Sequence, residues 1–526
     1  MGKPNSYDEV SYPGYPFPQT HPDRLATLAT LFGMKPTPVE SSRVLELGCG
    51  DGANLIPMAF GLPGSEFVGI DSAARPIAKG MTMVPALGLS NITLRQWDVL
   101  DISPEFGQFD YIIAHGLYSW VPPAVRDKIL SICKMNLAPQ GVAHVSYNSY
   151  PGGYLRRMAR EMMLFHVRDH IDPQEQVSRA RALVKFLSES QAESDAYKMF
   201  LKQELDRALA RGDESLYHDD LAEINTPVYF YQFMGHAARH GLQYLTEARL
   251  AESQTSVLSP LVTEAQNQLG DDVIAKEQYF DFLKCRMFRQ TLLCHRDVGL
   301  DRSLKPEQIK KFYVASSARP VSVKPDIGSP GVVEQFRVAN GAVISIDYPL
   351  AKATLLHLGE IWPQSVSFDE LRRKARALVG DNNQRQDARQ LDEELVSLCR
   401  LLLTLYGSDL LELRTCQPSF VTVASERPVV SPLARLQAQQ DSTLTTLRHT
   451  IIEVKDSLAK NLLMLLDGTR DRAALLRELT AAVESGRVTM EISGAQSNDR
   501  QAAFKISFEE LEQKLSELAR LALLVA

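Results

Sequence analysis

The chain has 526 residues, of which 44% are apolar and 23% charged, a globular composition with room for two to four domains. Its 57 Lys and Arg residues against 64 Asp and Glu residues give a formal charge of −7, so we expect no nucleic-acid partner. Without an apolar run of roughly 18 residues, a signal-peptide layout or metal-ligand spacing among its six cysteines, it is expected to be cytoplasmic, not inserted in a membrane and free of metal.

The first elements are typical of a doubly wound α/β sheet. Residues 43–47 (RVLEL) predict a strand buried on both faces, GCGDG interrupts it, and ANLIPMAF resumes with helical spacing. A second strand, EFVGI, is followed by Asp71, about 20 residues beyond the loop, where a ribose-binding carboxylate is expected. Ligands of such sheets bind beyond the carboxyl ends of the strands, so this loop is a candidate cofactor site.

The glycine loop by itself fits two cofactors. Gly48, Gly50 and Ala53 satisfy the permissive dinucleotide fingerprint, and Asp71 suits NAD as well as it suits any other ribose. The loop therefore does not decide between a dinucleotide and another nucleoside.

Three further carboxylates favour a cationic nucleoside. Glu46 and Asp51 lie at the loop, where negative charge repels a pyrophosphate and attracts an ammonium group. Asp98 follows the third strand (LRQWDVL), where it accepts a hydrogen bond from an adenine amino group or else serves as a turn residue. A ligand that carries an ammonium, a sulfonium, a ribose and an adenine matches this pattern of carboxylates. The sequence therefore predicts S-adenosylmethionine (SAM) as the cofactor.

The later elements complete the sheet after an interruption. Residues 109–122 predict a fourth strand, residues 122–141 a helix ending in a Pro-x-Gly turn, and residues 141–150 a fifth strand. Glu46 to Gly52, Asp71, Asp98 and the FD start of the fourth strand resemble the class I methyltransferases. The resemblance implies a seven-stranded sheet, and we assign LQYL and FRQTLLC to its last two strands. Residues 150–211, between the fifth strand and LQYL, predict three amphipathic helices, an insertion that forms a lid or a subunit interface.

The second half contains a repeat with no candidate site. VISIDYPLAKATLLHL (343–358) and IIEVKDSLAKNLLMLL (451–466) share Leu-Ala-Lys, and two further helices follow each copy. We interpret the copies as two winged-helix-like modules. Their helices carry as many acids as bases, which favours protein docking or dimer packing over DNA binding.

The expected fold is thus α/β, a Rossmann-like methyltransferase sheet with a helical insertion and two α+β winged-helix-like modules. The expected divisions are 1–149 and 218–298 for the sheet, 150–217 for the insertion, and 325–424 and 433–526 for the modules. Linkers are expected at 326–333 and 425–432.

The methyl acceptor is expected beyond the fourth and fifth strands. Aromatic and amide groups gather there, which suits a lysine ammonium and its methylated products. The predicted catalytic residues are Tyr118, Trp120, Tyr147 and Asn148, with Tyr150 and Tyr154 close by. The alternative for Tyr118 and Trp120 is packing on the next helix. AHGLYSW stands where enzymes that methylate nucleobase amines carry Asp/Asn-Pro-Pro-aromatic, which disfavours that activity.

Longer blocks resemble one particular family. SYDEVSYPGYPFPQTHPDRLATLATLFGM, AHGLYSWVPP and HDDLAEINTPVYFYQFMGHAARHGLQYLTEA are similar to the rickettsial-type protein-lysine methyltransferases of outer-membrane surface proteins, which carry a "methyltransferase regulatory domain". The resemblance implies SAM-dependent methylation of lysine side chains on a surface protein by a homodimer. We interpret the regulatory segment as the last two strands of the sheet.

The predicted cofactor-binding residues are Glu46, Gly48, Cys49, Gly50, Asp71, Ser72, Asp98, Val99 and His115. The leading segment YPGYPFPQTHP, with Tyr12, Tyr15 and His21, either folds over the cofactor or has a plain packing role. Two other functions stay open: a small-molecule O- or N-methyltransferase, and a non-catalytic SAM-binding regulatory protein.

Overall fold

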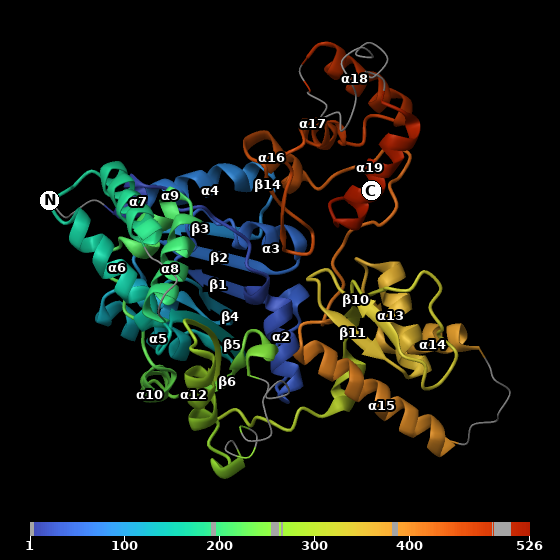
Figure 1. Ribbon diagram of the computed structural model, residues 1–526, viewed down its shortest axis with the longest axis horizontal. Helices are drawn as coiled ribbons and strands as arrows, with labels where there is room; N and C mark the ends of the chain where they lie inside the picture. Colours follow the sequence, from blue (N-terminus) through green and yellow to red (C-terminus); the bar gives the residue numbers. More distant parts are fainter. Residues whose placement is uncertain are drawn as a thin grey trace. The chain divides into compact units, whose positions relative to one another are not determined.

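The computed structural model describes residues 5–190, 196–253, 262, 264, 267–380, 388–486, 488 and 506–526. The chain divides into two compact units. Unit 1 comprises Met1–Tyr15, Leu28–Ile56 and Gly64–Ser303, and unit 2 comprises Pro16–Thr27, Pro57–Pro63 and Leu304–Ala526. Figure 1 gives the element labels used below.

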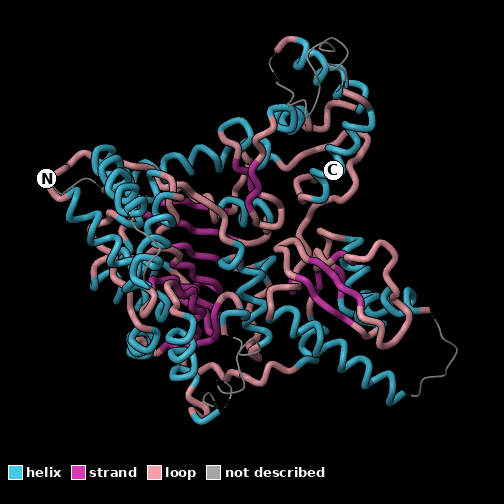
Figure 2. Tube along the Cα trace, viewed as in Figure 1, coloured by secondary structure: helices cyan, strands magenta, loops and turns pink. Residues whose placement is uncertain are grey.

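Unit 1 is built on a seven-stranded sheet in the order β3-β2-β1-β4-β5-β7-β6. Strands β1 to β5 are parallel and β7 is antiparallel to both of its neighbours, as the sequence predicts for a class I methyltransferase. The strands, drawn in magenta in Figure 2, are β1 (Arg43–Leu47), β2 (Glu66–Asp71), β3 (Ile92–Gln96), β4 (Phe109–Ala114), β5 (Leu137–Asn148), β6 (Leu242–Glu247) and β7 (Phe288–His295).

Strand β5 begins four residues earlier than the expected start at Gly141. The preceding helix ends at Met135, and Leu137 already pairs with Phe109 of β4. The next paired residues are Tyr111 and Val142, so a bulge absorbs the extra residues, Pro139 among them. The Pro-x-Gly sequence is therefore an irregularity inside a strand and not the end of a helix.

Helices cover the sheet and form the insertion (Figure 1). Those of unit 1 outside the insertion are α1 (Ser6–Glu9), α4 (Ala74–Ala86), α5 (Pro123–Met135), α10 (Phe230–Arg239) and α12 (Val273–Lys284). Helices α2 (Pro22–Leu31) and α3 (Leu55–Gly61) have residues in both units. The insertion consists of α6 (Gly153–Val167), α7 (Pro173–Ser190), α8 (Ala196–Leu209) and α9 (Asp213–Ser215), which continues into a π-helical turn at Leu216–Asp220. Helices α6, α7 and α8 share an apolar core of their own, as their three-and-four spacing predicts.

The segment from β6 to β7 belongs to the sheet, in agreement with the interpretation from sequence. Arg289 of β7 is fully buried and binds Glu247 of β6 at 2.6 Å and Asp281 of α12 at 2.8 Å. Its guanidinium lies 3.8 Å from the ring centroid of Phe230 at the start of α10. Burial raises the pKa of Glu247, but the guanidinium groups of Arg289 and Arg286 outweigh it and the pKa is lowered. The last two strands are thus held to the sheet by a buried ionic network.

The first module of unit 2 starts before the expected boundary at residue 325. Strand β8 pairs with both β12 and β13, so the module includes residues 313–315. Residues 326–333 are a loop inside this module and not a linker, because Lys352 Nζ donates to the carbonyl oxygens of Ser329 and Val332. The module contains β8 (Tyr313–Ala315), β9 (Arg319–Pro320), β10 (Glu334–Arg337), β11 (Val343–Ile346), α13 (Pro349–Ile361), β12 (Val366–Ser367), α14 (Phe368–Val379), α15 (Ala388–Gly407) and β13 (Glu412–Arg414).

The second module repeats the order of a strand followed by three helices. Its elements are α16 (Pro432–Gln440), β14 (Thr443–Thr445), β15 (Ile451–Glu453), α17 (Ser457–Leu465), α18 (Arg472–Glu484) and α19 (Phe508–Arg520). Lys352 and its counterpart Lys460 differ, because Lys352 is fully buried whereas Lys460 is only half-buried. Among the described helices of both units, none combines the length and apolarity that a membrane span requires.

Candidate active site

The glycine loop follows β1 and is tied to the neighbouring strand. The N–H groups of Gly48 and Cys49 both donate to the carbonyl oxygen of Ile70 in β2, at 2.8 and 3.0 Å. Gly48 and Gly50 have φ of +74° and +55°, and a Cβ at Gly50 would meet no atom within 4 Å. The loop thus offers bare backbone with open space beside Gly50.

Glu46 lies below the loop and is almost fully buried. Its Oε1 accepts a hydrogen bond from Asn54 Nδ2 at 2.7 Å, while Oε2 has no hydrogen-bond partner among the described residues. Burial raises the pKa of Glu46 to about 8, and the nearby carboxylates of Asp71 and Asp51 act in the same direction. A buried carboxylate oxygen without a donor is a place for a cationic group, so the site fits the ammonium of SAM.

Asp71 connects the end of β2 to the glycine loop. Its Oδ2 accepts from the Gly50 N–H and its Oδ1 from the Ala73 N–H, both at 2.9 Å. Burial raises the pKa of Asp71, although these N–H groups lower it. Each carboxylate oxygen has capacity for a second donor, as binding of a ribose diol requires. Asp51, by contrast, pairs with Lys79 Nζ at 2.7 Å, so this lysine balances part of the negative charge expected from Asp51.

The other predicted cofactor residues lie at the ends of β2, β3 and β4. Ser72 follows Asp71 on the surface, and the exposed Asp98 precedes the buried Val99. Asp98 accepts from the Leu100 N–H at 2.9 Å, which is the turn role left open by the sequence, and its contact with adenine stays a prediction. The ring of His115 lies 5.5 Å from that of His144, and burial together with His144 lowers its pKa to about 3. His115 is therefore a neutral imidazole near pH 7.

Residues 5–15 lie over this loop. Asn5 Nδ2 donates to Ser72 Oγ at 3.1 Å, and the Arg75 N–H donates to Asp8 at 2.7 Å. The Tyr7 ring stacks on His218 of the π-helical turn at 4.2 Å. Gly14 lies so close to the loop that a Cβ there would come 2.5 Å from Ala53 Cβ. The leading segment thus borders the cofactor loop up to Tyr15.

His21, expected to help close the cofactor pocket, has contacts in unit 2. Its ring lies 5.1 Å from that of His449, and burial lowers its pKa to about 4. Residues 16–27 all belong to unit 2 by their contacts. The part of the leading segment that borders the loop therefore ends before His21.

Two of the predicted catalytic residues are interior side chains. Tyr147 is fully buried, stacks on Phe233 at 4.1 Å and shares a hydrogen bond with Thr291. Tyr118 is 3% exposed, and its hydroxyl lies 2.8 Å from His236 Nδ1. These contacts are those of packing, the alternative that the sequence left open for Tyr118.

The other two predicted catalytic residues have different surroundings. Trp120 is half-buried, and its Nε1 has no hydrogen-bond partner in the described part of the chain. Asn148, at the end of β5, donates from Nδ2 to Asn225 at 2.8 Å and borders a small hollow. Arg156, Arg157 and Arg160 of α6 line the same hollow. Asn148 is thus the predicted residue that is buried beside a small hollow with charged neighbours.

An aromatic cluster, defined as Tyr150, Tyr154, Tyr229, Tyr231 and Phe282, lies just beyond Asn148. Tyr150 stacks on Tyr154 at 4.0 Å and contacts Tyr229 at 5.3 Å. Tyr229 in turn contacts Tyr231 and Phe282. Tyr154, Tyr231 and Phe282 are 46–51% exposed, so the rings present an open aromatic face. The sequence indicated Tyr150 and Tyr154 and missed the other three, which come from residues about 75 to 130 positions away.

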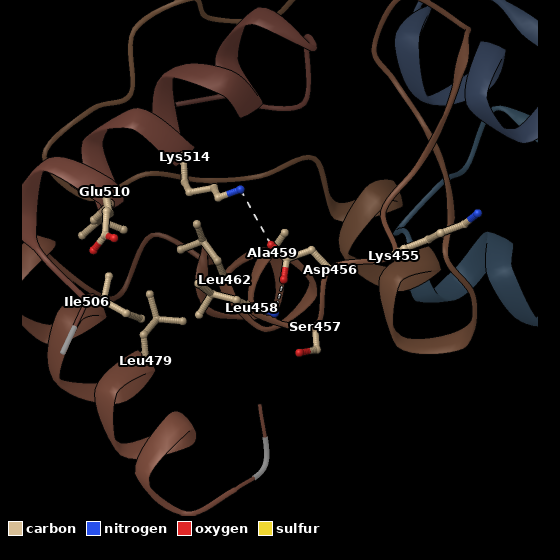
Figure 3. A pocket seen from close by; sticks show the side chains of 11 residues that line it. Lys455, Asp456, Ser457, Leu458, Ala459, Leu462, Leu479, Ile506, Glu510 and Lys514 are labelled. Carbon is tan, nitrogen blue, oxygen red and sulfur yellow. Dashed lines mark hydrogen bonds and ion pairs between the residues drawn. The ribbon is translucent and has the colours of Figure 1, made fainter. Parts of the chain in front are cut away.

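A larger hollow lies in the second module of unit 2 (Figure 3). Its wall is mainly apolar, and the Lys514–Asp456 ion pair lies across one side at 3.7 Å. Ile506 in this wall adjoins residues outside the described part of the chain. The hollow is far along the chain from the strand ends that hold the glycine loop, and we assign it no role in the chemistry.

The sheet, the loop and the orphaned oxygen of Glu46 define a class I SAM-dependent methyltransferase. Models of known families agree: residues 45–143 match a methyltransferase domain, 212–295 a predicted methyltransferase regulatory domain, and 426–523 the PKMT, C-terminal winged helix domain. SAM supplies an activated methyl group, and this chain's residues hold and orient it.

Relatives match along nearly the whole chain. An uncharacterised protein of Rickettsia prowazekii is 33% identical over 521 residues, which are 98% of this chain and 91% of the relative. PKMT2 from Rickettsia typhi superposes with a TM-score of 0.88 and 29% identity, covering 98% of this chain and all of PKMT2. PKMT2 in complex with AdoHcy gives a TM-score of 0.87. The chain belongs to the family of rickettsial-type protein-lysine methyltransferases.

Proposed function

We propose that this methyltransferase transfers methyl groups from SAM to lysine side chains of a protein, one exposed on the cell surface or in the outer membrane. The observation that carries the proposal is the likeness to PKMT2 over 98% of the chain, insertion and modules included. A likeness limited to the sheet would leave the acceptor open, because that core serves many acceptors.

The aromatic cluster supports a lysine acceptor. Ring faces attract an ammonium or a methylated ammonium by cation–π interaction, and open rings admit a side chain carried by a large protein. Methyl transfer needs the neutral amine, and positive charge nearby lowers an amine's pKa. Arg160, whose guanidinium donates to the Ala222 carbonyl, lies beside Asn148 and supplies such charge.

The test is to incubate the purified full chain with methyl-labelled SAM and outer-membrane fractions from its own cell. We expect label in protein lysines, seen by mass spectrometry as successive additions of one methyl group. Label confined to small metabolites would instead support the small-molecule alternative. SAM binding without transfer to any fraction would support the non-catalytic one.

Tyr154→Ala is expected to lower kcat/KM for the protein acceptor by roughly 2- to 30-fold, the range of about 0.5–2 kcal/mol for a cation–π contact. Its affinity for SAM should stay unchanged. Tyr197→Ala is the matched control, because Tyr197 is equally exposed, at 52%, but lies on α8. Equal losses of kcat/KM in both variants would show that the aromatic cluster is not part of the acceptor site.

A further inference from the structure

Helices α5 and α10 present three metal-ligating side chains to one another. His236 lies in the last turn of α10 and His240 is the C-cap residue that follows it, with their ring centroids 5.5 Å apart. Asp127 of α5 lies opposite, with its Oδ1 3.0 Å from His236 Nε2 and 2.8 Å from His240 Nε2. Each of the three residues offers one ligand atom, and these atoms all lie within 4.8 Å of one another. Among the described residues, no other group of three is found with such spacing.

The geometry is close to that of a tetrahedral metal site. With metal–ligand distances of about 2.0–2.1 Å, neighbouring ligand atoms of a tetrahedron lie about 3.3 Å apart. The two distances to Asp127 Oδ1 are a few tenths of an ångström shorter, so a small side-chain adjustment admits an ion. Asp127 is 62% exposed, which leaves room for water at a fourth position.

A buried tyrosine orients one of the ligands. His236 Nδ1 lies 2.8 Å from the hydroxyl of Tyr118, and Tyr118 is held by Phe233 in an edge-to-face contact at 5.2 Å. Metal-ligating imidazoles characteristically bond a second group through the nitrogen that does not bind the metal. With a metal on Nε2, His236 donates from Nδ1 to Tyr118, and without one it accepts from that hydroxyl.

Two arginines near the site oppose a cation. The guanidinium of Arg126 lies 5.7 Å from the ring centroid of Tyr118, and Arg239 donates to the carbonyl of Gly235 one turn back along α10. Because these positive charges repel any cation, they favour a transition-metal ion that forms coordinate bonds to imidazole nitrogens over an ion such as Mg²⁺ or Ca²⁺. Two imidazoles and one carboxylate are ligands typical of zinc.

We propose that Asp127, His236 and His240 bind a divalent transition-metal ion of the zinc class that links α5 to α10. The ion joins the helix before β5 to the helix before β6. Through His236 and Tyr118 it also fixes the turn that follows β4. This site is independent of the identity of the methyl acceptor.

The experiment uses the untagged full chain, stripped of metal by a chelator and titrated with Co²⁺ or Zn²⁺. We expect one ion per chain by atomic absorption, visible Co²⁺ bands of tetrahedral intensity, and a higher melting temperature with Zn²⁺. His240→Gln should lose the bands, whereas His166→Gln, at an exposed position on α6, should keep them. Absence of Co²⁺ bands in the wild type, or equal loss in both variants, overturns the proposal.

Two further variants separate ligation from folding. His240→Cys keeps a ligand and should retain the ion with Co²⁺ bands shifted by the thiolate, which a merely structural histidine does not explain. Tyr118→Phe keeps the packed ring and should weaken the metal affinity by about 10- to 100-fold. Unchanged Co²⁺ spectra for both variants would exclude this set of ligands.

Discussion

At the scale of single residues, Glu46 carries the clearest electrostatic signature of the cofactor. The side chain is buried, one of its oxygens lacks a donor among the described residues, and its pKa is raised to about 8. In the protein without cofactor it is therefore protonated at neutral pH. An incoming ammonium favours the ionised form, so binding is coupled to the release of a proton.

Glu46→Gln is expected to weaken SAM binding by about 1.5–3 kcal/mol, roughly 10- to 150-fold, because a charged hydrogen bond is lost. In the wild type, affinity should rise between pH 6 and 7, by up to about tenfold per pH unit, since Glu46 must lose its proton on binding and its pKa is raised. Calorimetry in two buffers of different ionisation enthalpy measures the released proton, which Glu46→Gln should abolish.

The control for this prediction is Glu105→Gln, since Glu105 is exposed in the short 3-10 helix Pro104–Phe106 of the same unit. Its affinity and proton release should match the wild type. A pH-independent wild-type affinity between pH 6 and 8 would contradict the assignment of Glu46 to the ammonium.

The residue scale also shows where sequence reasoning stops. The order of strands correctly placed Tyr118 and Tyr147 near strand ends, but it did not predict which side chains pack against them. Phe233, the ring on which both pack, is about 90 to 115 residues away in sequence. Which face a side chain covers is decided by such distant partners, so packing and catalysis were indistinguishable in the sequence.

At the scale of elements, the leading segment 5–15 adds a border to the cofactor site. It bonds to Ser72 and Arg75 at one end of the loop and stacks on His218 of the π-helical turn. A short segment with few buried side chains is stabilised mainly by these contacts, and such segments open at low free-energy cost. We therefore expect it to control exchange of the cofactor.

Gly14→Ala is expected to displace this segment, because the added Cβ would clash with Asp51 and lie 2.5 Å from Ala53 Cβ. SAM should dissociate faster, by several-fold to tenfold, with little change in the melting temperature of the chain. Stopped-flow displacement measures the rate. Gly299→Ala is the matched control, since a Cβ there meets nothing within 4 Å. Equal dissociation rates in the two variants would mean that the segment does not cover the cofactor.

At the scale of the whole molecule, residues far apart in sequence complete unit 2. Asp23 is 3% exposed and accepts hydrogen bonds from the Thr415 N–H at 2.6 Å and from its hydroxyl at 2.7 Å. The Cys416 N–H donates to the same oxygen at 3.3 Å. A segment of the first 27 residues is thus a structural part of a unit formed mainly by residues 304–526.

Asp23→Ala is expected to destabilise unit 2 by about 3 kcal/mol, because it leaves backbone donors unsatisfied and removes one of the two ion-pair partners of the half-buried Arg414. Thermal unfolding of the full chain should show the loss. Asp392→Ala, at an exposed position of α15, should change the stability by less than about 0.5 kcal/mol. Similar melting curves for both variants would show that Asp23 is not structural.

Local patterns determined a large part of this protein. Buried runs predicted the strands, helical spacing predicted the insertion, and the glycine loop with its neighbouring carboxylates predicted SAM, because these patterns are properties of residues close in sequence. The repeat predicted two modules, although β8 showed that the first begins before residue 325.

Only the tertiary structure decided the rest. The unpaired oxygen of Glu46, the aromatic cluster, the Asp127–His236–His240 group and the place of Asp23 all join side chains from separate elements or depend on what surrounds them. The His-x-x-x-His spacing at 236–240 was visible in the sequence, but its carboxylate partner was not. Charge and coordination depend on distances through space, and folding fixes these through contacts that a local pattern does not contain.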